Sequence, residues 1–331
     1  MLCRLSSTRR KRPVPDGWSD SDVISSFDVI ATSNVKLDGS KTARADDSGD
    51  LVLTGGVQGS AGVYSISQQS LIKTFDLGKG AIVDAIWWDG KVVAGMTTGA
   101  IKIFEDSEGR DLGLHSGNVA ALSLHPSGSI LASVGQDKAY MLYDLQSMKM
   151  INRIYIESGE LASYASSFTD LTAHAFAEPT CGSFHPDGHL FAAGCVDGQI
   201  RLFDSKSSDN LATFDGQGRI QNISFSENGT WLAVSVRGSN AVQVWDLRKS
   251  SIVTTLEIGG AVSNVRWDYT GQFLATVGAS GVTVQQYQKS SKKWSEPLRK
   301  ALPCVDVSWG TRAKSLVVLT EQGQLQVLGA K

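Results

Sequence analysis

The stretch FHPDGHLFAAGCVDGQIRLFD, residues 184–204, decides the fold of this chain and also offers a competing interpretation. Its 21 positions hold five side chains of the types that bind zinc or activate a nucleophile: His185, Asp187, His189, Cys195 and Asp197. The same letters also spell two polar turns around an apolar strand, because Asp and Gly accept turn geometry and proline presets φ. Recurrence of the stretch elsewhere in the chain would favour the second interpretation.

The stretch does recur. Four other segments share its order of an alternating strand, a polar turn and a second apolar strand: VAALSLHPSGSILASVG, IQNISFSENGTWLAVSV, VSNVRWDYTGQFLATVG and CVDVSWGTRAKSLVVLT. The large apolar residue before each turn falls at Leu124, Phe184, Phe225, Trp267 and Trp309. The successive spacings are 60, 41, 42 and 42 residues, and Trp88 fits one unit earlier.

A second column of residues comes from a later strand of each unit. Its aromatic residues and their equivalents are Tyr64, Phe104, Tyr143, Phe203, Trp245, Gln285 and Leu328. Their spacings are 40, 39, 60, 42, 40 and 43, so the interval of 60 falls at the same place in both columns. About 19 residues are therefore inserted between the third and fourth units, and we place this insert at about 155–177.

A period near 42 residues with several short strands predicts a WD-repeat (WD40) β-propeller. Each unit forms a four-stranded blade, and seven units predict an all-β, seven-bladed ring. Because the last unit lacks an outermost strand, we expect the segment 27–35 to supply it and to close the ring. The predicted propeller spans 27–331, after a basic, flexible linker over 1–26.

Composition argues against several classes of function. The chain has 331 residues and a formal net charge of −2, so its surface offers no broad attraction to nucleic acid or to an anionic membrane. One basic run, residues 9–12 in STRRKRPVP, is either a nuclear-import signal or a solvated tail. The four cysteines show no paired spacing, and we see neither a secretory signal nor a membrane-spanning apolar stretch, so we expect an intracellular protein with reduced thiols.

The repeats assign structural roles to most polar residues. HPSG and HPDG turn one strand into the next, and we expect their histidines, His125 and His185, to lie too far apart around the ring to share a metal. In WD repeats an Asp often accepts a hydrogen bond from a His in the preceding loop. This contact links the His to a strand Ser or Thr and to a strand aromatic residue. The third unit keeps such a set, which we predict to be a buried structural network rather than a catalytic triad: His115, Ser133, Asp137 and Tyr143.

Three stretches resemble one known family. PTCGSFHPDGHLFAAGCVDGQIRLFD, ISFSENGTWLAVSVRGSNAVQVWDLRK and GDLVLTGG resemble the C-terminal propeller of the pre-mRNA-processing factor nineteen family of splicing-associated ubiquitin ligases. The resemblance covers residues 8–331 and includes the basic segment before the ring. It implies a nuclear role in pre-mRNA splicing, links to DNA repair and ubiquitin signalling, and partners among the spliceosomal proteins of the nineteen complex.

The chain departs from that family at its N-terminus. In the family a U-box recruits the ubiquitin-conjugating enzyme, a coiled coil makes a homotetramer, and the propeller binds partners and substrates. This sequence has no U-box before residue 27 and no heptad stretch. We therefore expect a fragment or a truncated gene product that is monomeric and not an enzyme by itself, with ubiquitin ligation, its substrates and tetramer formation belonging to a longer parent.

We predict a rigid docking platform with no catalytic residue, metal or cofactor. Its candidate contact face carries the loops between blades and between second and third strands, with Arg219, Arg237, Lys138 and the segment 156–176 as candidate contacts. The alternative for each is an ordinary solvated loop residue. Two rival functions remain: a WD-repeat adaptor of another nuclear complex, and an enzyme whose acid, base or nucleophilic groups converge in the central channel. We expect no direct contact with nucleic acid or membrane.

Overall fold

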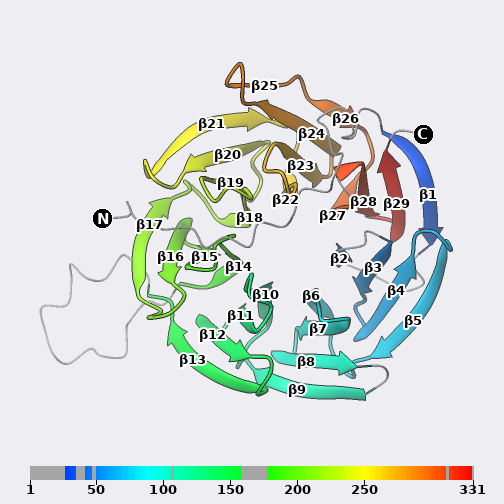
Figure 1. Ribbon diagram of the computed structural model, residues 1–331, viewed down its shortest axis with the longest axis vertical. Coiled ribbons are helices and arrows are strands. Elements are labelled where there is room, and N and C mark those ends of the chain that lie inside the picture. Colours follow the sequence, from blue (N-terminus) through cyan, green and yellow to red (C-terminus); the bar gives the residue numbers. More distant parts are fainter. Residues whose placement is uncertain are drawn as a thin grey trace, which may run out of the picture.

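The structure, a computed structural model, describes residues 27–34, 42–46, 50–105, 108–157, 177–310 and 313–329. Seven antiparallel sheets surround a common centre, one for each repeat unit (Figure 1). This arrangement confirms the predicted all-β, seven-bladed propeller. In these described ranges there is no α-helix, and so no helix with the length and apolarity that a membrane crossing requires. The predicted linker 1–26, with its basic run, lies outside the described residues.

Every blade runs from an inner strand beside the centre of the ring to an outer strand at its rim (Figure 1). The inner strands of blades 1 to 7 are β2 (Thr42–Ala45), β6 (Ile82–Trp88), β10 (Val119–Leu124), β14 (Pro179–Phe184), β18 (Ile220–Phe225), β22 (Val262–Trp267) and β27 (Cys304–Trp309). The second strands are β3 (Leu51–Gly55), β7 (Lys91–Met96), β11 (Ile130–Gly135), β15 (Leu190–Cys195), β19 (Trp231–Val236), β23 (Phe273–Gly278) and β28 (Ser315–Thr320).

The third and outer strands complete the blades. The third strands are β4 (Ser60–Ser65), β8 (Ala100–Glu105), β12 (Ala139–Asp144), β16 (Gln199–Asp204), β20 (Ala241–Asp246), β24 (Gly281–Gln288) and β29 (Gln324–Gly329). The outer strands are β5 (Ser70–Asp76), β9 (Glu108–Leu114), β13 (Lys149–Tyr155), β17 (Asn210–Asp215), β21 (Ser251–Glu257), the short pair β25 (Lys293–Trp294) and β26 (Leu298–Lys300) in blade 6, and β1 (Asp28–Asn34) in blade 7. Both residue columns of the sequence therefore fall on fixed strands, the first column on inner strands and the second on third strands.

The two ends of the domain meet in blade 7. Strand β1 pairs antiparallel with β29, from Asp28 opposite Gly329 to Asn34 opposite Gln324 (Figure 1). This pairing confirms that the segment near 27–35 supplies the missing strand. It also leaves β29 without an open edge, which is the usual liability of an unfinished sheet.

Bulges interrupt the outer strands at one repeated position. The pairing of β12 with β13 passes from Asn152 to Met150 and leaves Ile151 as the extra residue. The equivalent extra residues are Ile30, Ile72, Leu211 and Val253, whereas the bulge of blade 2, at Leu112, lies two residue pairs away from this position. A bulge twists a strand and disrupts the ladder, so it discourages a second chain from pairing with these exposed edges.

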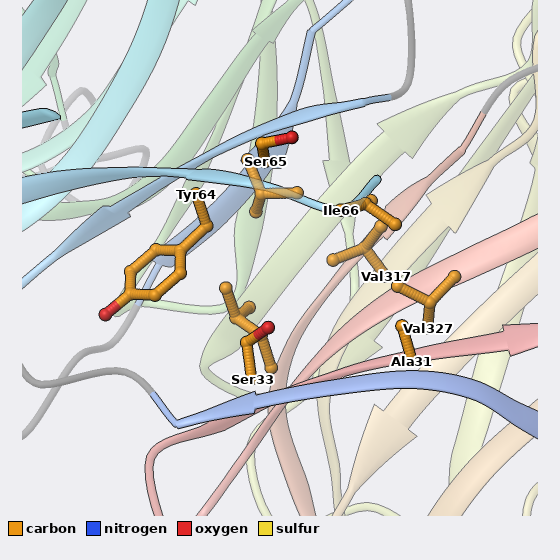
Figure 2. A pocket seen from close by; sticks show the side chains of 9 residues that line it. Ala31, Ser33, Tyr64, Ser65, Ile66, Val317 and Val327 are labelled. Carbon is orange, nitrogen blue, oxygen red and sulfur yellow. The ribbon is translucent and has the colours of Figure 1, made fainter. Parts of the chain in front are cut away.

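Apolar side chains from neighbouring blades pack face to face and form the core. Between blades 3 and 4, for example, the Tyr140 and Phe191 rings are stacked with centroids 4.4 Å apart. At the seam where the ring closes, Tyr64 and Ser65 face Ala31 and Ser33 of β1 (Figure 2). The cavity left there is about 10 Å³, at the lower limit for one water molecule, so this seam holds no ligand site.

The predicted insert falls between blades 3 and 4 in the sequence. Blade 3 ends with β13 and blade 4 begins with β14. The amide of Ala177 donates a hydrogen bond of 2.8 Å to the carbonyl of Ile156, so the two ends of the insert are held together on the ring. Residues 158–176, which make up most of the insert, lie outside the described residues.

Candidate functional site

The loops of the ring gather on two faces. What we call the upper face carries the loops before each inner strand and those between second and third strands, such as 216–219 and 237–240 in blade 5. The lower face carries the turns from first to second and from third to fourth strands, such as 185–189 in blade 4. Because each blade has an even number of alternating strands, this division is the same in every blade.

The polar residues of stretch 184–204 are divided between these faces. His185 lies in a lower-face turn, whereas Cys195 ends β15 and Asp197 follows it on the upper face. Burial raises the pKa of the Cys195 thiol to about 12, so it is not a thiolate nucleophile at neutral pH. Asp197 instead receives two hydrogen bonds, of 2.6 and 3.1 Å, from the guanidinium of Arg201. Among the described residues, no group of three or more His, Cys, Asp or Glu is placed to hold a metal ion.

Lower-face turns of neighbouring blades are joined by ring nitrogens. Trp88 Nε1 donates to the Gly128 carbonyl at 2.8 Å, linking blade 2 to blade 3. His125 Nε2 donates to the Gly188 carbonyl at 3.0 Å, and His185 Nε2 donates to the Gly229 carbonyl at 2.8 Å. The expected wide separation of the two histidines is therefore wrong, because their blades are neighbours and their turns touch. The carbonyl partners show that each histidine holds the next blade.

The structure brings three members of the blade 3 set together. His115 Nδ1 donates to Asp137 Oδ1 at 2.7 Å, and His115 Nε2 lies 2.8 Å from Ser133 Oγ. Burial lowers the pKa of His115, and the hydrogen bond with Asp137 offsets only part of that effect, so the imidazole is neutral. Its Nε2 atom therefore accepts a hydrogen bond from the Ser133 hydroxyl. Tyr143, on β12, adjoins Ser133: burial raises the pKa of Tyr143, and a hydrogen bond with Ser133 offsets part of that effect. The Tyr143 hydroxyl donates to Met141 Sδ at 3.0 Å.

On paper, Ser133, His115 and Asp137 have the connectivity of a hydrolytic triad. Exposure decides against that chemistry, since Ser133 is 0% exposed and His115 is 1% exposed, so a substrate cannot reach the hydroxyl. The sequence did not point to Arg153, which donates to Asp137 Oδ2 at 3.1 Å. Its spacing of 16 residues from Asp137 follows no motif, and only the pairing of β12 with β13 reveals it.

Two of the three candidate contact residues lie together on the upper face. Arg219 and Arg237 are both exposed, and the Arg237 amide donates to the Arg219 carbonyl at 2.8 Å. The loop carrying Arg219 is held in place because Gln243 Nε2 donates to the Gly216 carbonyl at 3.1 Å. Lys138 is also on the upper face but belongs to blade 3, two blades away, and is only partly exposed. The three residues therefore do not form one cluster.

An ionic cluster links blades 7, 1 and 2 near the centre of the ring. The Arg44 guanidinium lies 2.8 Å from Asp306 Oδ2 and 3.0 Å from Asp84 Oδ1. Asp306 Oδ2 also accepts the Ala43 amide, and Asp84 Oδ2 accepts the Leu122 amide from blade 3. Both carboxylates thus join inner strands of neighbouring blades.

One known family matches more than half of the chain. A sequence profile of the family described as "Nucleolar protein 10-like, N-terminal domain", a β-propeller family, matches residues 110–290. The chain belongs to this family. The matched region of this family member runs from blade 2 into the outer part of blade 6 and contains the blade 3 network and both upper-face arginines.

Similarity to a second group extends over nearly the whole chain. Pre-mRNA-processing factor 19 of Oryza sativa subsp. japonica is 26% identical over 348 residues, covering 98% of this chain and 62% of the relative. The Schizosaccharomyces pombe protein of the same name is 26% identical and covers 97% and 62%. Pre-mRNA-processing factor 19 homolog 2 of Arabidopsis thaliana is also 26% identical and covers 98% and 61%. The chain is thus a distant relative that spans about three fifths of the length of these proteins.

Proposed function

We propose that this ring is a protein-interaction platform in a nuclear pre-mRNA splicing assembly, where it docks spliceosomal proteins through its upper face. The observation that carries the proposal is the similarity to pre-mRNA-processing factor 19 over 97–98% of the chain in three organisms. Because the similarity spans all seven blades, it favours a function that uses the whole ring over a function that uses a single motif.

The upper face supports docking in blade 5. Arg219 and Arg237 are exposed and adjacent, and each guanidinium can pair bidentately with a carboxylate of a partner. Their loops are fixed by backbone and side-chain hydrogen bonds, so little conformational entropy is lost on binding. Lys138 offers a separate, weaker contact from blade 3.

The proposal assigns ubiquitin ligation to a longer parent protein. In that arrangement this ring supplies partners or ubiquitination substrates, and a U-box and coiled coil elsewhere supply transfer and tetramer formation. Among the described residues, the buried triad-like set and the central carboxylates are both engaged in contacts that hold the fold.

Affinity capture from nuclear extract tests the docking proposal. The full chain is tagged at its C-terminus and compared with an Arg219→Glu/Arg237→Glu double variant. Arg248→Glu is the matched control, since Arg248 is an exposed arginine in a lower-face turn of the same blade. We expect splicing proteins with the wild type and the control, and their loss with the double variant. If the wild type captures no splicing proteins, the proposal is wrong. If the double variant still captures them, the upper face is not the docking face.

A second candidate is an adaptor role in a nucleolar complex, which the matched family description favours. The same capture experiment separates the two. Enrichment of nucleolar proteins without splicing proteins, again lost in the double variant, supports this candidate and rejects the first.

A further inference from the structure

Arg44 and Arg266 occupy equivalent positions on inner strands. Trp87 Nε1 donates to the Arg44 carbonyl at 3.0 Å, and Trp309 Nε1 donates to the Arg266 carbonyl at 3.1 Å. Each tryptophan belongs to the blade that follows its acceptor, so the two contacts are the same contact made at two places in the ring. Both arginines therefore stand at one level of the inner strands, in blades 1 and 6.

Four of the other blades carry serine at this level, and three of these serines join blades. Ser123 Oγ accepts the Phe184 amide at 2.9 Å, and Ser224 Oγ accepts the Trp267 amide at 3.1 Å. Ser308 Oγ likewise accepts the Ala45 amide at 3.1 Å. A guanidinium has donors only and cannot accept an amide N–H, so Arg266 does not replace serine in this role.

Arg44 contacts two carboxylates directly, whereas Arg266 is attracted by the same two, Asp306 and Asp84, without contacting either. Throughout the described ranges, no hydrogen bond or ion pair joins the Arg266 guanidinium to another protein group. The nearest carboxylate is engaged elsewhere, because Asp306 Oδ1 accepts from Asn264 and from the Val307 amide while Oδ2 binds Arg44. Arg266 is only partly exposed, so water cannot solvate it as fully as a surface side chain.

The electrostatic setting of Arg266 is unfavourable to its charge. Burial lowers the pKa of Arg266 to about 10, and the neighbouring Arg44 cation lowers it further than either Asp306 or Asp84 alone raises it. Placing a partly buried cation without a counter-ion in direct contact costs free energy. An anion beside this guanidinium would remove that cost.

We propose that Arg266 binds a small oxyanion, a phosphate or carboxylate group, at the centre of the ring. The planar guanidinium offers two parallel N–H donors that match either group. The group comes from a free ion or from an acidic side chain that a partner inserts, and both present the same oxygens. This site is separate from the upper-face arginines, so it stands or fails independently of the docking proposal.

The test measures the melting temperature of the full chain at pH 7 while sodium phosphate or sodium acetate replaces sodium chloride at constant ionic strength. We expect a saturable rise with phosphate, acetate or both, since a ligand that binds only the folded state stabilises it. A response to phosphate alone identifies a phosphate group as the ligand, and a response to acetate alone identifies a carboxylate group. No saturable response to either ion overturns the proposal.

Two variants localise the response. Arg266→Met removes the charge and should weaken the apparent affinity for the anion at least about tenfold. Arg266→Lys keeps the charge but loses the two parallel N–H donors, so its affinity should lie between those of the wild type and Arg266→Met. Arg248→Met, an equal change at an exposed lower-face arginine, should respond as the wild type does. A response that Arg266→Met retains, or that Arg248→Met equally loses, overturns the assignment.

Crystals of the wild type decide the matter if Arg266→Met does not fold. Grown with selenate as the oxyanion probe, they should show an anomalous peak at the Arg266 guanidinium. Peaks only at surface cations would overturn the site.

Discussion

The Nε2 atom of His125 lies 3.0 Å from the carbonyl oxygen of Gly188, so the turn of one blade holds the turn of the next. Ser127 completes the arrangement, because its amide donates to His125 Nδ1 at 3.0 Å and thereby fixes the imidazole as the neutral form that donates from Nε2. The contact requires both a ring nitrogen at 125 and a residue without a side chain at 188. Substitutions on either side of it can be compared with equivalent positions elsewhere in the ring.

Replacing Gly188 with alanine should destabilise the ring more than the same change at Gly128. Both glycines have positive φ, 79° and 75°, so each alanine incurs a backbone cost of about 1–2 kcal/mol. A Cβ at Gly188 would also lie 2.2 Å from His125 Nε2, whereas one at Gly128 meets nothing within 4 Å. Chemical denaturation should therefore show a further loss of about 1–3 kcal/mol for Gly188→Ala. Equal losses of unfolding free energy in the two variants would show that the contact between His125 and residue 188 adjusts to the added methyl group without destabilising the ring.

Stability should fall as the pH drops below about 6.5. Burial lowers the pKa of both His115 and His125, so the unfolded chain binds more protons than the folded chain in this window. The free energy of unfolding then rises with pH and reaches its full value above the unfolded pKa. Urea denaturation at pH 7.5, 6.5 and 5.5 measures it, and His125→Gln should reduce the slope. A wild type that becomes more stable toward pH 5.5 contradicts this sign.

Breaking the blade 3 network should be costly. Asp137→Ala leaves the buried His115 and the Ser116 amide without their acceptor, so we expect a loss of about 2–4 kcal/mol in the free energy of unfolding. Asp144→Ala is the control, because that carboxylate ends β12 of the same blade and binds the turn that follows, at Gln146 and Ser147. Circular dichroism during denaturation compares the two, and a smaller loss for Asp137→Ala than for the control would refute the structural role.

Removing β1 should open the ring. A chain that starts at residue 36 lacks the partner of β29, so it exposes a sheet edge and the apolar seam around Ala31. We expect a lower denaturation midpoint and concentration-dependent association, measured by light scattering after size-exclusion chromatography. A chain that starts at residue 27 keeps β1 and should match the full chain in both measurements. Monomeric, fully stable protein from the shorter chain would show that closure by β1 is dispensable.

The repeat spacing predicted most of the fold because it is a property of the whole chain. Phe184 and Trp267 were placed on equivalent inner strands by spacing alone, and the closing role of segment 27–35 followed from the missing strand in the last unit. The bulge at Ile151 and its equivalents could not be foreseen, because a bulge depends on the register between two strands rather than on the residues of either.

The contacts between blades were hidden for a related reason. His125 and Gly188 are 63 residues apart, and their contact depends on the placement of two whole blades. The turn letters HPSG and HPDG therefore pointed only to local turns. Arg266 was overlooked because one charged residue in an alternating strand is unremarkable in sequence. Its lack of a carboxylate in direct contact appears only when Asp306 is seen to be occupied by Arg44 and Asn264.

The pairing of β1 with β29 also determines the order in which the domain can be completed during synthesis. Strand β1 leaves the ribosome first, yet its partner is translated almost 300 residues later, and only then can blade 7 form. Until that moment the apolar edge of residues 28–34 has no native partner, and the first six blades form an open arc. A chaperone that shields this segment during translation would protect the part of the chain that waits longest.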